Sequence, residues 1–327
     1  MLSQPPSHPS LPALHEIEAA AELIRAHIPS TPTYAWPLLR EETGCEVWVK
    51  HENHTPLGAF KARGGMVYID ELLRAEPQTP GVIAASTGNH GQSIAWNARR
   101  RGLRPVIVVP KGNNPDKNAA MRALGAELVE HGREFQEALD HSRDLAKREG
   151  LHAVPSFHPW LVRGVATYAL EFFRQAPPVD VVYVPIGLGS GFCGMAAARQ
   201  ALGLSTRLIG VVSERAPAYA LSFRERLLIT EPSTTRVAEG VACSTPNASA
   251  LEWILQHADD VITVSDDDAL SAMRGLLQAT HNLAEGAGAL AFAAIRKQRD
   301  HLQGQRVGCV LSGGNASLTM VAEALGQ

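Results

Sequence analysis

The sequence repeatedly alternates short apolar runs with stretches of amphipathic or polar residues, and this alternation limits the folds that it can adopt. The apolar runs are continuous, as in strands of a parallel sheet that is covered on both faces. The pattern therefore predicts an α/β fold built of parallel sheets with helices on both faces. The predicted strands are residues 46–50, 81–85, 105–110, 179–184, 208–212, 261–264 and 307–311.

Helix signals lie between these runs. Asn114 followed by Pro115 suits the first turn of a helix, and Gly125 suits the position just after its end. Ser265 precedes three aspartates, which favour the positive end of a helix. Further helices are predicted at residues 13–28, 66–73, 91–101, 134–149 and 287–300, with another that ends at Leu202.

The chain has 327 residues, of which 45% are hydrophobic, and this is enough to build two lobes. No short repeat or low-complexity linker separates the halves, so we expect two closely packed lobes with a ligand cleft at the carboxyl ends of their strands. We assign residues 1–50 plus 160–327 to a large domain and residues 51–159 to a small inserted domain. Residues 1–12 are expected to be a loose tail.

Composition excludes several classes of function. A formal net charge of −3 gives no electrostatic basis for binding nucleic acid or an anionic membrane. No apolar run approaches the ~20 residues that span a bilayer. The cysteines lack CxxC spacing, which argues against a zinc or disulfide framework, and we expect a cytoplasmic enzyme without a metal. The four cysteines are Cys45, Cys193, Cys243 and Cys309.

Lys61 is the first candidate for a catalytic residue. Among the six lysines of the chain, only Lys61 follows an aromatic residue, Phe60, and lies between glycines on both sides. Close packing would desolvate its ammonium and lower its pKa, so that a free amine could attack a carbonyl. The alternative is a lysine at a helix start that packs by its stem. We favour an amine that holds an aldehyde cofactor.

A second loop, residues 86–91, joins a predicted strand to a predicted helix. Its hydroxyls, its amide side chain and its backbone N–H groups at a helix N-terminus form a seat for an anion, such as a substrate carboxylate. An ordinary helix cap would have the same composition. The residues are Ser86, Thr87, Gly88, Asn89, His90 and Gly91.

A third loop is rich in glycine and again joins a strand to a helix. Glycines allow the backbone to approach a phosphate, whose charge the helix N-terminus favours. The loop lacks the GxGxxG spacing of a dinucleotide site, so a compact phosphate cup is the better interpretation. The loop comprises Gly187, Leu188, Gly189, Ser190 and Gly191.

A fourth loop, Ser312-Gly313-Gly314-Asn315, follows the last predicted strand. It could be a plain turn. As the partner of a pyridine nitrogen, however, the neutral Ser312 hydroxyl would leave the ring a weaker electron sink than a carboxylate would, which suits β-elimination.

Together and in this order, the four loops resemble those of the fold type II pyridoxal-phosphate enzymes, in particular the serine/threonine dehydratase group with its serine racemases and hydroxy-amino-acid ammonia-lyases. The resemblance runs from about Ile24 to the last strand. It implies the tryptophan synthase beta-like fold, with pyridoxal 5'-phosphate in the cleft between two lobes, and a homodimer. It also implies that Lys61 forms the imine with the cofactor.

The resemblance assigns roles to individual residues. Lys61 and Thr87 are the implied catalytic residues. The implied substrate-binding residues are Ser86, Thr87, Gly88, Asn89 and His90. The implied cofactor-binding residues are Phe60, Lys61, Asn89, Gly187, Leu188, Gly189, Ser190, Gly191, Glu285, Ser312 and Gly313.

Some positions depart from the pattern of the group. Ala59 replaces the usual serine before Phe60, and Thr87 stands where racemases carry an acid/base serine. Glu214 matches one carboxylate of the racemases' cation site, but Ala220 falls at the expected second acid. We therefore expect no metal.

The expected activity is removal of water and ammonia from a β-hydroxy amino acid such as threonine or serine. A racemase or a β-replacement enzyme is the alternative, and a nicotinamide dehydrogenase or a non-catalytic binding protein would be a different class. The substrate stays open, and the candidate residues for its recognition are His54, Phe157, His158, Ala238, Glu239 and Gly240.

Overall fold

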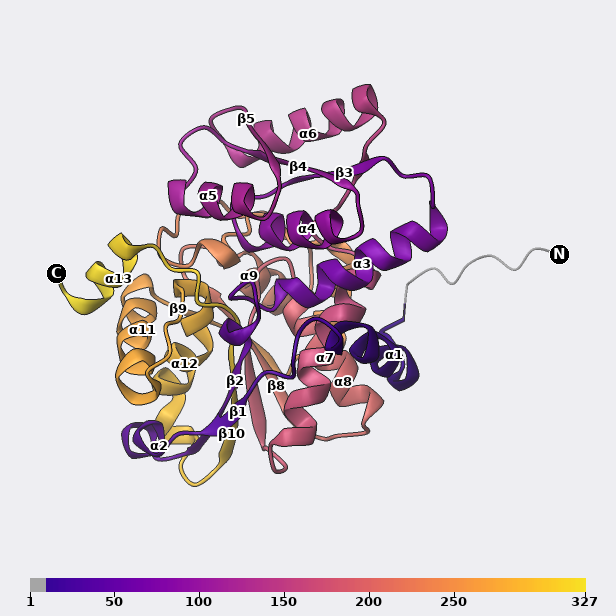
Figure 1. Ribbon diagram of the computed structural model, residues 1–327. Coiled ribbons are helices and arrows are strands. Elements are labelled where there is room, and N and C mark those ends of the chain that lie inside the picture. Colours follow the sequence, from indigo (N-terminus) through magenta and orange to yellow (C-terminus); the bar gives the residue numbers. More distant parts are fainter. Residues whose placement is uncertain (1–9) are drawn as a thin grey trace.

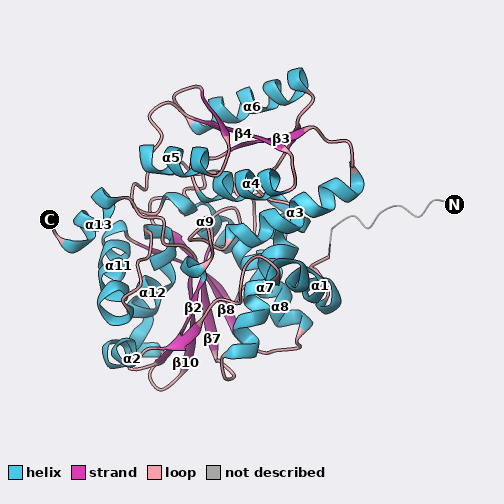
Figure 2. Cartoon of the chain, in the orientation of Figure 1, coloured by secondary structure: helices cyan, strands magenta, loops and turns pink. Residues whose placement is uncertain are grey.

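Two separate sheets form the framework of the protein, for which the computed structural model describes residues 10–327 (Figures 1 and 2). Most of the tail predicted at residues 1–12 lies outside this described part. The six-stranded sheet has the order β1-β2-β10-β7-β8-β9, and the four-stranded sheet has the order β5-β4-β3-β6. All pairings are parallel except that of β1 with β2, so the predicted α/β class is confirmed, with one antiparallel edge strand.

The elements have the following bounds. In the six-stranded sheet the strands are β1 (Thr33–Ala35), β2 (Glu46–His51), β7 (Val181–Pro185), β8 (Arg207–Ser213), β9 (Asp260–Val264) and β10 (Arg306–Leu311). In the four-stranded sheet they are β3 (Gly81–Ala85), β4 (Arg104–Val109), β5 (Glu127–Glu130) and β6 (His152–Ala153). The α-helices are α1 (Leu14–Arg25), α2 (Pro37–Thr43), α3 (Lys61–Ala75), α4 (Asn89–Arg100), α5 (Pro115–Ala123), α6 (Phe135–Glu149), α7 (Pro159–Gln175), α8 (Ser190–Ala201), α9 (Ala218–Glu225), α10 (Ala248–His257), α11 (Asp266–Thr280), α12 (Gly286–Gln298) and α13 (Leu318–Leu325). Short 3₁₀ turns are η1 (Glu52–His54), η2 (Glu239–Val241) and η3 (Arg299–His301).

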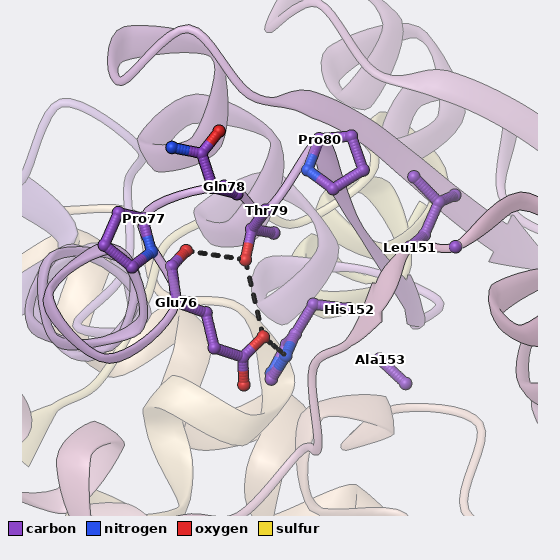
Figure 3. Close-up of a pocket in the computed structure, with 9 residues that line it drawn as sticks. Glu76, Pro77, Gln78, Thr79, Pro80, Leu151, His152 and Ala153 are labelled. Carbon is purple, nitrogen blue, oxygen red and sulfur yellow. Dashed lines mark hydrogen bonds and ion pairs between the residues drawn. The ribbon is translucent and has the colours of Figure 1, made fainter.

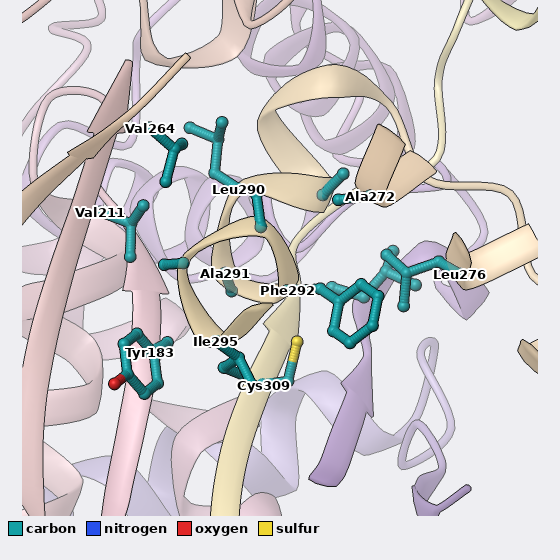
Figure 4. Packing of buried hydrophobic residues seen from close by; sticks show 14 of the residues in the cluster. Tyr183, Val211, Val264, Ala272, Leu276, Leu290, Ala291, Phe292, Ile295 and Cys309 are labelled. Atoms are coloured by element: carbon teal, nitrogen blue, oxygen red, sulfur yellow. The ribbon is translucent and has the colours of Figure 1, made fainter. Parts of the chain in front are cut away.

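Continuous apolar strands are explained by burial of the larger sheet on both faces. Along β7, Val181 and Tyr183 face the core under α11 and α12, which Figure 4 shows from close by. Val182 and Val184 alternate with them and face the core under α7 and α8. Since side chains alternate between faces of a strand, a strand covered on both sides must be apolar at every position.

The smaller sheet follows the same rule. Val82 and Ala84 of β3 pack with α4, while Ile83 packs with α6 on the opposite face. Its four strands come from residues 81–153, and the strands of the larger sheet lie on both sides of that segment in the sequence. The proposed domain boundaries near residues 50 and 160 stay a prediction.

The helices of residues 10–327 differ from the predictions in their bounds and in their number. Helices α2, α7, α9, α10 and α13 were not predicted. The helix predicted at residues 66–73 begins at Lys61, five residues earlier, because Gly64 and Gly65 are part of it. Each glycine lies where another helix approaches: a Cβ on Gly64 would be 2.9 Å from the carbonyl oxygen of Leu161, and one on Gly65 would be 2.2 Å from the Ser93 hydroxyl. Helix α7 was not predicted at all, although it packs against both α3 and α8.

Capping predictions were accurate. The Asn114 side chain accepts hydrogen bonds from the first turn of α5, and Ser265 forms a capping box with Asp268 at the start of α11. The first predicted helix is shorter than expected, ending at Arg25. Among residues 10–327, no helix is both long enough and apolar enough to cross a bilayer.

A buried cluster of charges joins α3 to its neighbours. The Arg63 guanidinium donates to Glu52 at 2.8 Å and to Glu171 of α7 at 2.8 Å. Lys50 of β2 also donates to Glu171, at 2.8 Å. The Arg63, Glu52 and Lys50 side chains are fully buried, and buried charges are tolerated only when they are paired and hydrogen-bonded. The cluster therefore fixes the first turns of α3 against β2 and α7.

Replacing Arg63 by Met should strongly destabilise the protein, because it leaves the Glu52 carboxylate buried without its cation. We expect the free energy of unfolding, measured by urea denaturation, to fall by roughly 3–5 kcal/mol. The matched control is Arg143→Met, which removes an exposed ion pair with Asp140 and should cost less than about 1 kcal/mol. Equal losses in the two variants would contradict a structural role for the cluster.

Candidate active site

The four predicted loops meet at the carboxyl ends of their strands. The Lys61 loop follows β2, residues 86–91 join β3 to α4, residues 187–191 join β7 to α8, and residues 312–315 follow β10. Backbone hydrogen bonds run from Phe60 N–H to the Ser312 carbonyl at 3.1 Å and from Gly314 N–H to the Gly58 carbonyl at 2.9 Å. Segments about 250 residues apart in the sequence thus form one site.

Lys61 is the first residue of α3, and its amine lies deep in this site. Its Nζ donates to the Ser190 hydroxyl at 3.2 Å and lies 5.0 Å from the centre of the Phe60 ring. Burial lowers the pKa of Lys61 to about 8. An appreciable fraction of the amine is therefore unprotonated near neutral pH, as nucleophilic attack requires.

The loop at residues 86–91 forms the start of α4. The Ser86 hydroxyl accepts hydrogen bonds from Gly91 N–H at 2.8 Å and Gly88 N–H at 3.3 Å, so this side chain serves as a cap within the loop. The backbone carbonyl of Thr87 accepts a hydrogen bond from the Asn113 side chain at 3.3 Å. The Thr87 side chain is half-buried. The positive end of α4 favours an anion at this loop.

His90 lies buried beside Lys61. Burial, together with the nearby Lys61 charge, lowers the pKa of His90 to about 3, so the imidazole is neutral at physiological pH. In the described part of the chain, its Nε2 has no hydrogen-bond partner. A buried polar atom without a partner costs free energy unless a ligand or water satisfies it, and it therefore fits a polar ligand in this cleft.

The glycine loop at residues 187–191 has the shape of an anion cradle. Gly189 adopts a φ of +102°, and a Cβ there would lie 2.7 Å from that of Ala250. The hydroxyls of Tyr219 and Tyr168 donate to the carbonyls of Leu188 and Gly191, both at 3.0 Å. The N-cap of α8 is Gly189, which has no side chain to cap the helix, and within residues 10–327 no side chain accepts from the first N–H groups of α8. These N–H groups fit a phosphate group.

A chain of polar groups lies beside this cradle. Asn89 donates to the Glu285 carboxylate at 2.6 Å and accepts from Asn315 at 2.8 Å. Glu285 N–H donates to the Gly313 carbonyl at 3.0 Å, and a Cβ on Gly313 would come within 2.6 Å of the Glu285 carboxylate. Burial raises the pKa of Glu285. The structure thus brings Asn89, Glu285 and Gly313 together, three residues to which the resemblance gives cofactor-binding roles. It adds Asn315, which was quoted in the fourth loop without a role.

The mouth of the site contains two groups that sequence reasoning did not connect. Lys117, in the first turn of α5, forms an ion pair with Glu239 of η2. A narrow cavity at the mouth is lined by these two residues together with Asn114, Val237, Gly240, Glu285, Gly286, Ala287, Asn315, Ser317 and Met320. Glu239 was a candidate for substrate recognition, whereas Lys117 was set aside because it has no aromatic neighbour.

Of the other candidates for substrate recognition, Gly240 lines this cavity and the remaining four do not. His54 is exposed and bonds to Asn282, and His158 accepts a hydrogen bond from Trp160 N–H at the start of α7. Phe157 and Ala238 belong to the hydrophobic cores, while Gly240 is a lining residue. Of the six candidates for substrate recognition, Glu239 and its neighbour Gly240 line the cavity at the mouth of the site.

Two other parts of the molecule contain titratable groups. Within residues 10–327, no three metal-ligating side chains cluster, and Glu214 pairs with Lys297 at 3.2 Å. A second pocket, with a volume of about 520 Å³, lies at the amino ends of β3 and β6. Figure 3 shows the residues around it, among which His152 pairs with Glu76. None of the predicted site residues lines it. Its lining residues are Glu76, Pro77, Gln78, Thr79, Pro80, Gly150, Leu151, His152 and Ala153.

Comparison with known proteins agrees with this geometry. A family model described as "Pyridoxal-phosphate dependent enzyme" matches residues 24–313. The chain is 32% identical over 317 residues to a catabolic L-threonine dehydratase from Escherichia coli (strain K12), covering 96% of each protein. It is 31% identical over 316 residues to an L-threo-3-hydroxyaspartate ammonia-lyase from a Pseudomonas species, covering 96% of this chain and 99% of that one. Among solved structures, the chain resembles that of maize serine racemase with a TM-score of 0.89 at 25% sequence identity. The match covers 97% of this chain and 97% of the racemase chain.

These matches confirm the predicted cofactor and the predicted family, and they contradict the alternatives of a nicotinamide dehydrogenase or a non-catalytic binding protein. The chain belongs to the pyridoxal-phosphate dependent enzymes, in the group that contains the threonine dehydratases and the serine racemases.

Proposed function

We propose that this protein is a pyridoxal-phosphate dependent ammonia-lyase that converts a β-hydroxy amino acid to a 2-oxo acid and ammonia. The observation that carries the proposal is the buried Lys61 amine, with its pKa lowered to about 8, at 3.2 Å from Ser190 in the phosphate cradle. The names of the relatives, a threonine dehydratase and a hydroxyaspartate ammonia-lyase, support the same reaction type.

The residues that hold the cofactor follow from the geometry of the loops. The N–H groups of residues 187–191 would bind the phosphate, and Lys61 would bind the aldehyde carbon. Asn89 and Glu285 would lie along one edge of the ring, and Ser312 would face its nitrogen. When bound, pyridoxal phosphate supplies an electron sink for the electron pair left at the substrate Cα.

The seat at the start of α4 would orient the substrate. The N–H groups of residues 87–90 and the neutral His90 would bind its carboxylate, with Thr87 close to the reacting carbon. The Lys61 amine, once free, would take the proton from Cα. The β-hydroxyl would take up one proton and leave as water, and a later water molecule would replace the amino group, which would leave as ammonia. The net products are one 2-oxo acid and one ammonia for each substrate.

A neutral Ser312 next to the ring nitrogen favours elimination over reactions that need a stronger electron sink. Racemisation at Cα is the second candidate, since Thr87 carries a hydroxyl in the seat and serine racemases share the fold. A homodimer and a cytoplasmic location stay predictions, as do the individual residue roles.

Lys61→Ala tests the proposal directly. Loss of the base and of the attachment point should lower kcat/KM for ammonia release by at least about 10³-fold. It should also abolish the long-wavelength absorbance of the lysine-bound cofactor and its fixation by borohydride. Lys111→Ala, at an exposed lysine of the same sheet region, is the control. A reducible cofactor adduct in Lys61→Ala would overturn the assignment, and racemised substrate without ammonia from the wild type would support the second candidate.

The pKa of Lys61 makes a separate prediction for the protein freed of its cofactor. Because burial lowers this pKa to about 8 from 10.5, the unprotonated amine increases as pH rises through 8. The rate of cofactor attachment, followed by absorbance, should rise between about pH 7 and 9 and then level off. Nα-acetyllysine is the control, since its reaction should keep rising to above pH 10. An identical profile for both amines would contradict the desolvation of Lys61.

Gly189→Ala should weaken binding of pyridoxal phosphate, because a Cβ at φ +102° would meet Ala250 at 2.7 Å and displace the cradle. We expect the Kd for the cofactor, from fluorescence titration, to rise by about tenfold or more. Gly203→Ala is the matched control, with a φ of +64° but no atom within 4 Å of its Cβ. It should leave the Kd as in the wild type, and equal Kd values in both variants would refute the cradle.

A further inference from the structure

Lys117 places an ammonium group at the edge of the anion seat. A Cβ on Gly88 would lie 3.4 Å from Lys117 Cδ and 3.8 Å from its Nζ. Only 14% of the Lys117 side chain is exposed, so the ammonium is held in the cleft rather than in solvent. The Lys117 side chain therefore reaches the loop that would hold the substrate.

The partner of Lys117 is held much more loosely. The Glu239 carboxylate comes from the short turn η2 and is 42% exposed. Water can solvate the Glu239 carboxylate where it is exposed, so breaking the ion pair leaves this partner solvated and not buried. A competing carboxylate could therefore take the place of Glu239 at small cost.

The remaining groups around Lys117 are mostly neutral. Asn114, Asn315 and Ser317 line the cavity, and burial raises the pKa of Glu285, which favours its uncharged form. The side chain of a serine or threonine substrate is uncharged and cannot form an ion pair with the Lys117 ammonium. A second carboxylate on the substrate can form one, and charge-assisted hydrogen bonds are stronger than neutral ones.

We propose that Lys117 is a specificity-determining residue and that the preferred substrate is a β-hydroxy amino acid with a second carboxylate, of the 3-hydroxyaspartate type. The inference rests on the proposed function and names its substrate class. The α-carboxylate occupies the seat at residues 87–90, the second carboxylate accepts from Lys117 Nζ, and Glu239 turns to solvent. The L-threo-3-hydroxyaspartate ammonia-lyase among the relatives acts on a substrate of this class by its name.

The test compares two substrates with the cofactor-loaded enzyme. Ammonia release gives kcat/KM for L-threo-3-hydroxyaspartate and for L-threonine, and the ratio of the two is the measure of specificity. We expect a ratio above ten in the wild type. Lys117→Met should lower the ratio by about 10- to 100-fold, as expected for the loss of a hydrogen bond to a charged group. Lys117→Arg keeps the charge and should keep most of the ratio.

Two other variants separate recognition from a merely structural ion pair. Glu239→Gln removes the competing carboxylate and should raise the ratio by lowering KM for hydroxyaspartate. Lys147→Met, at an exposed lysine on α6, is the matched control and should leave the ratio as in the wild type. The proposal is overturned if Lys117→Met and Glu239→Gln lower kcat/KM for both substrates by one common factor, since the pair then only joins the two sheet regions.

Failure of this inference differs from failure of the proposed function. A wild-type ratio below one, with ammonia and 2-oxo acid still formed from threonine, refutes the role of Lys117 alone. Absence of ammonia from every β-hydroxy amino acid, dicarboxylic or neutral, refutes the ammonia-lyase proposal itself.

Discussion

The position of the reactive amine depends on a buried ion cluster two residues further along the same helix. Arg63 pairs with Glu52 and with Glu171, and all three must stay paired because unpaired charges in a protein interior are costly. These contacts join α3 both to the segment after β2 and to α7. The start of α3, where Lys61 lies, is therefore held by these ion pairs and by the close packing of Gly64 against Leu161 of α7. The desolvation that lowers the pKa of Lys61 follows from that placement.

Main-chain contacts then assemble the rest of the site around this amine. The loop before α3 bonds to the loop after β10 through Phe60 and Ser312, and Ala59 forms a bridge with Gly313. Small residues are required along this contact: a Cβ on Gly313 would strike Glu285 and approach Ala59 at 3.1 Å. The alanine that replaces the usual serine at position 59 is fully covered there, so the space for a larger polar side chain is limited.

Seven of the ten strands in residues 10–327 and the four loops could be predicted from the sequence, because both show local patterns. The short strands β1, β5 and β6 were not predicted. A strand buried on two faces shows a continuous apolar run, and a strand followed by glycine and a helix marks a site at the carboxyl edge. Helix α7 escaped prediction because its start at His158-Pro159 and its internal Gly164 resemble a loop. A Cβ on Gly164 would lie 2.5 Å from the carbonyl oxygen of Arg63, so this glycine permits a close helix crossing, which no local pattern reveals. The pairing of Lys117 with Glu239, 122 residues apart, was equally hidden from the sequence.

Lys61 and Lys117 lie in the same cleft, but their different surroundings suit them to different roles. Lys61 lies in a desolvated position beside a hydroxyl and an aromatic ring, and burial moves its pKa towards neutrality. Lys117 instead forms an ion pair with the Glu239 carboxylate at the mouth of the site. A nucleophile and base must lose its proton, whereas a group that recognises an anion must keep it. The distribution of carboxylates around the cleft, and not its number of lysines, therefore separates the chemistry at Cα from recognition of the substrate side chain.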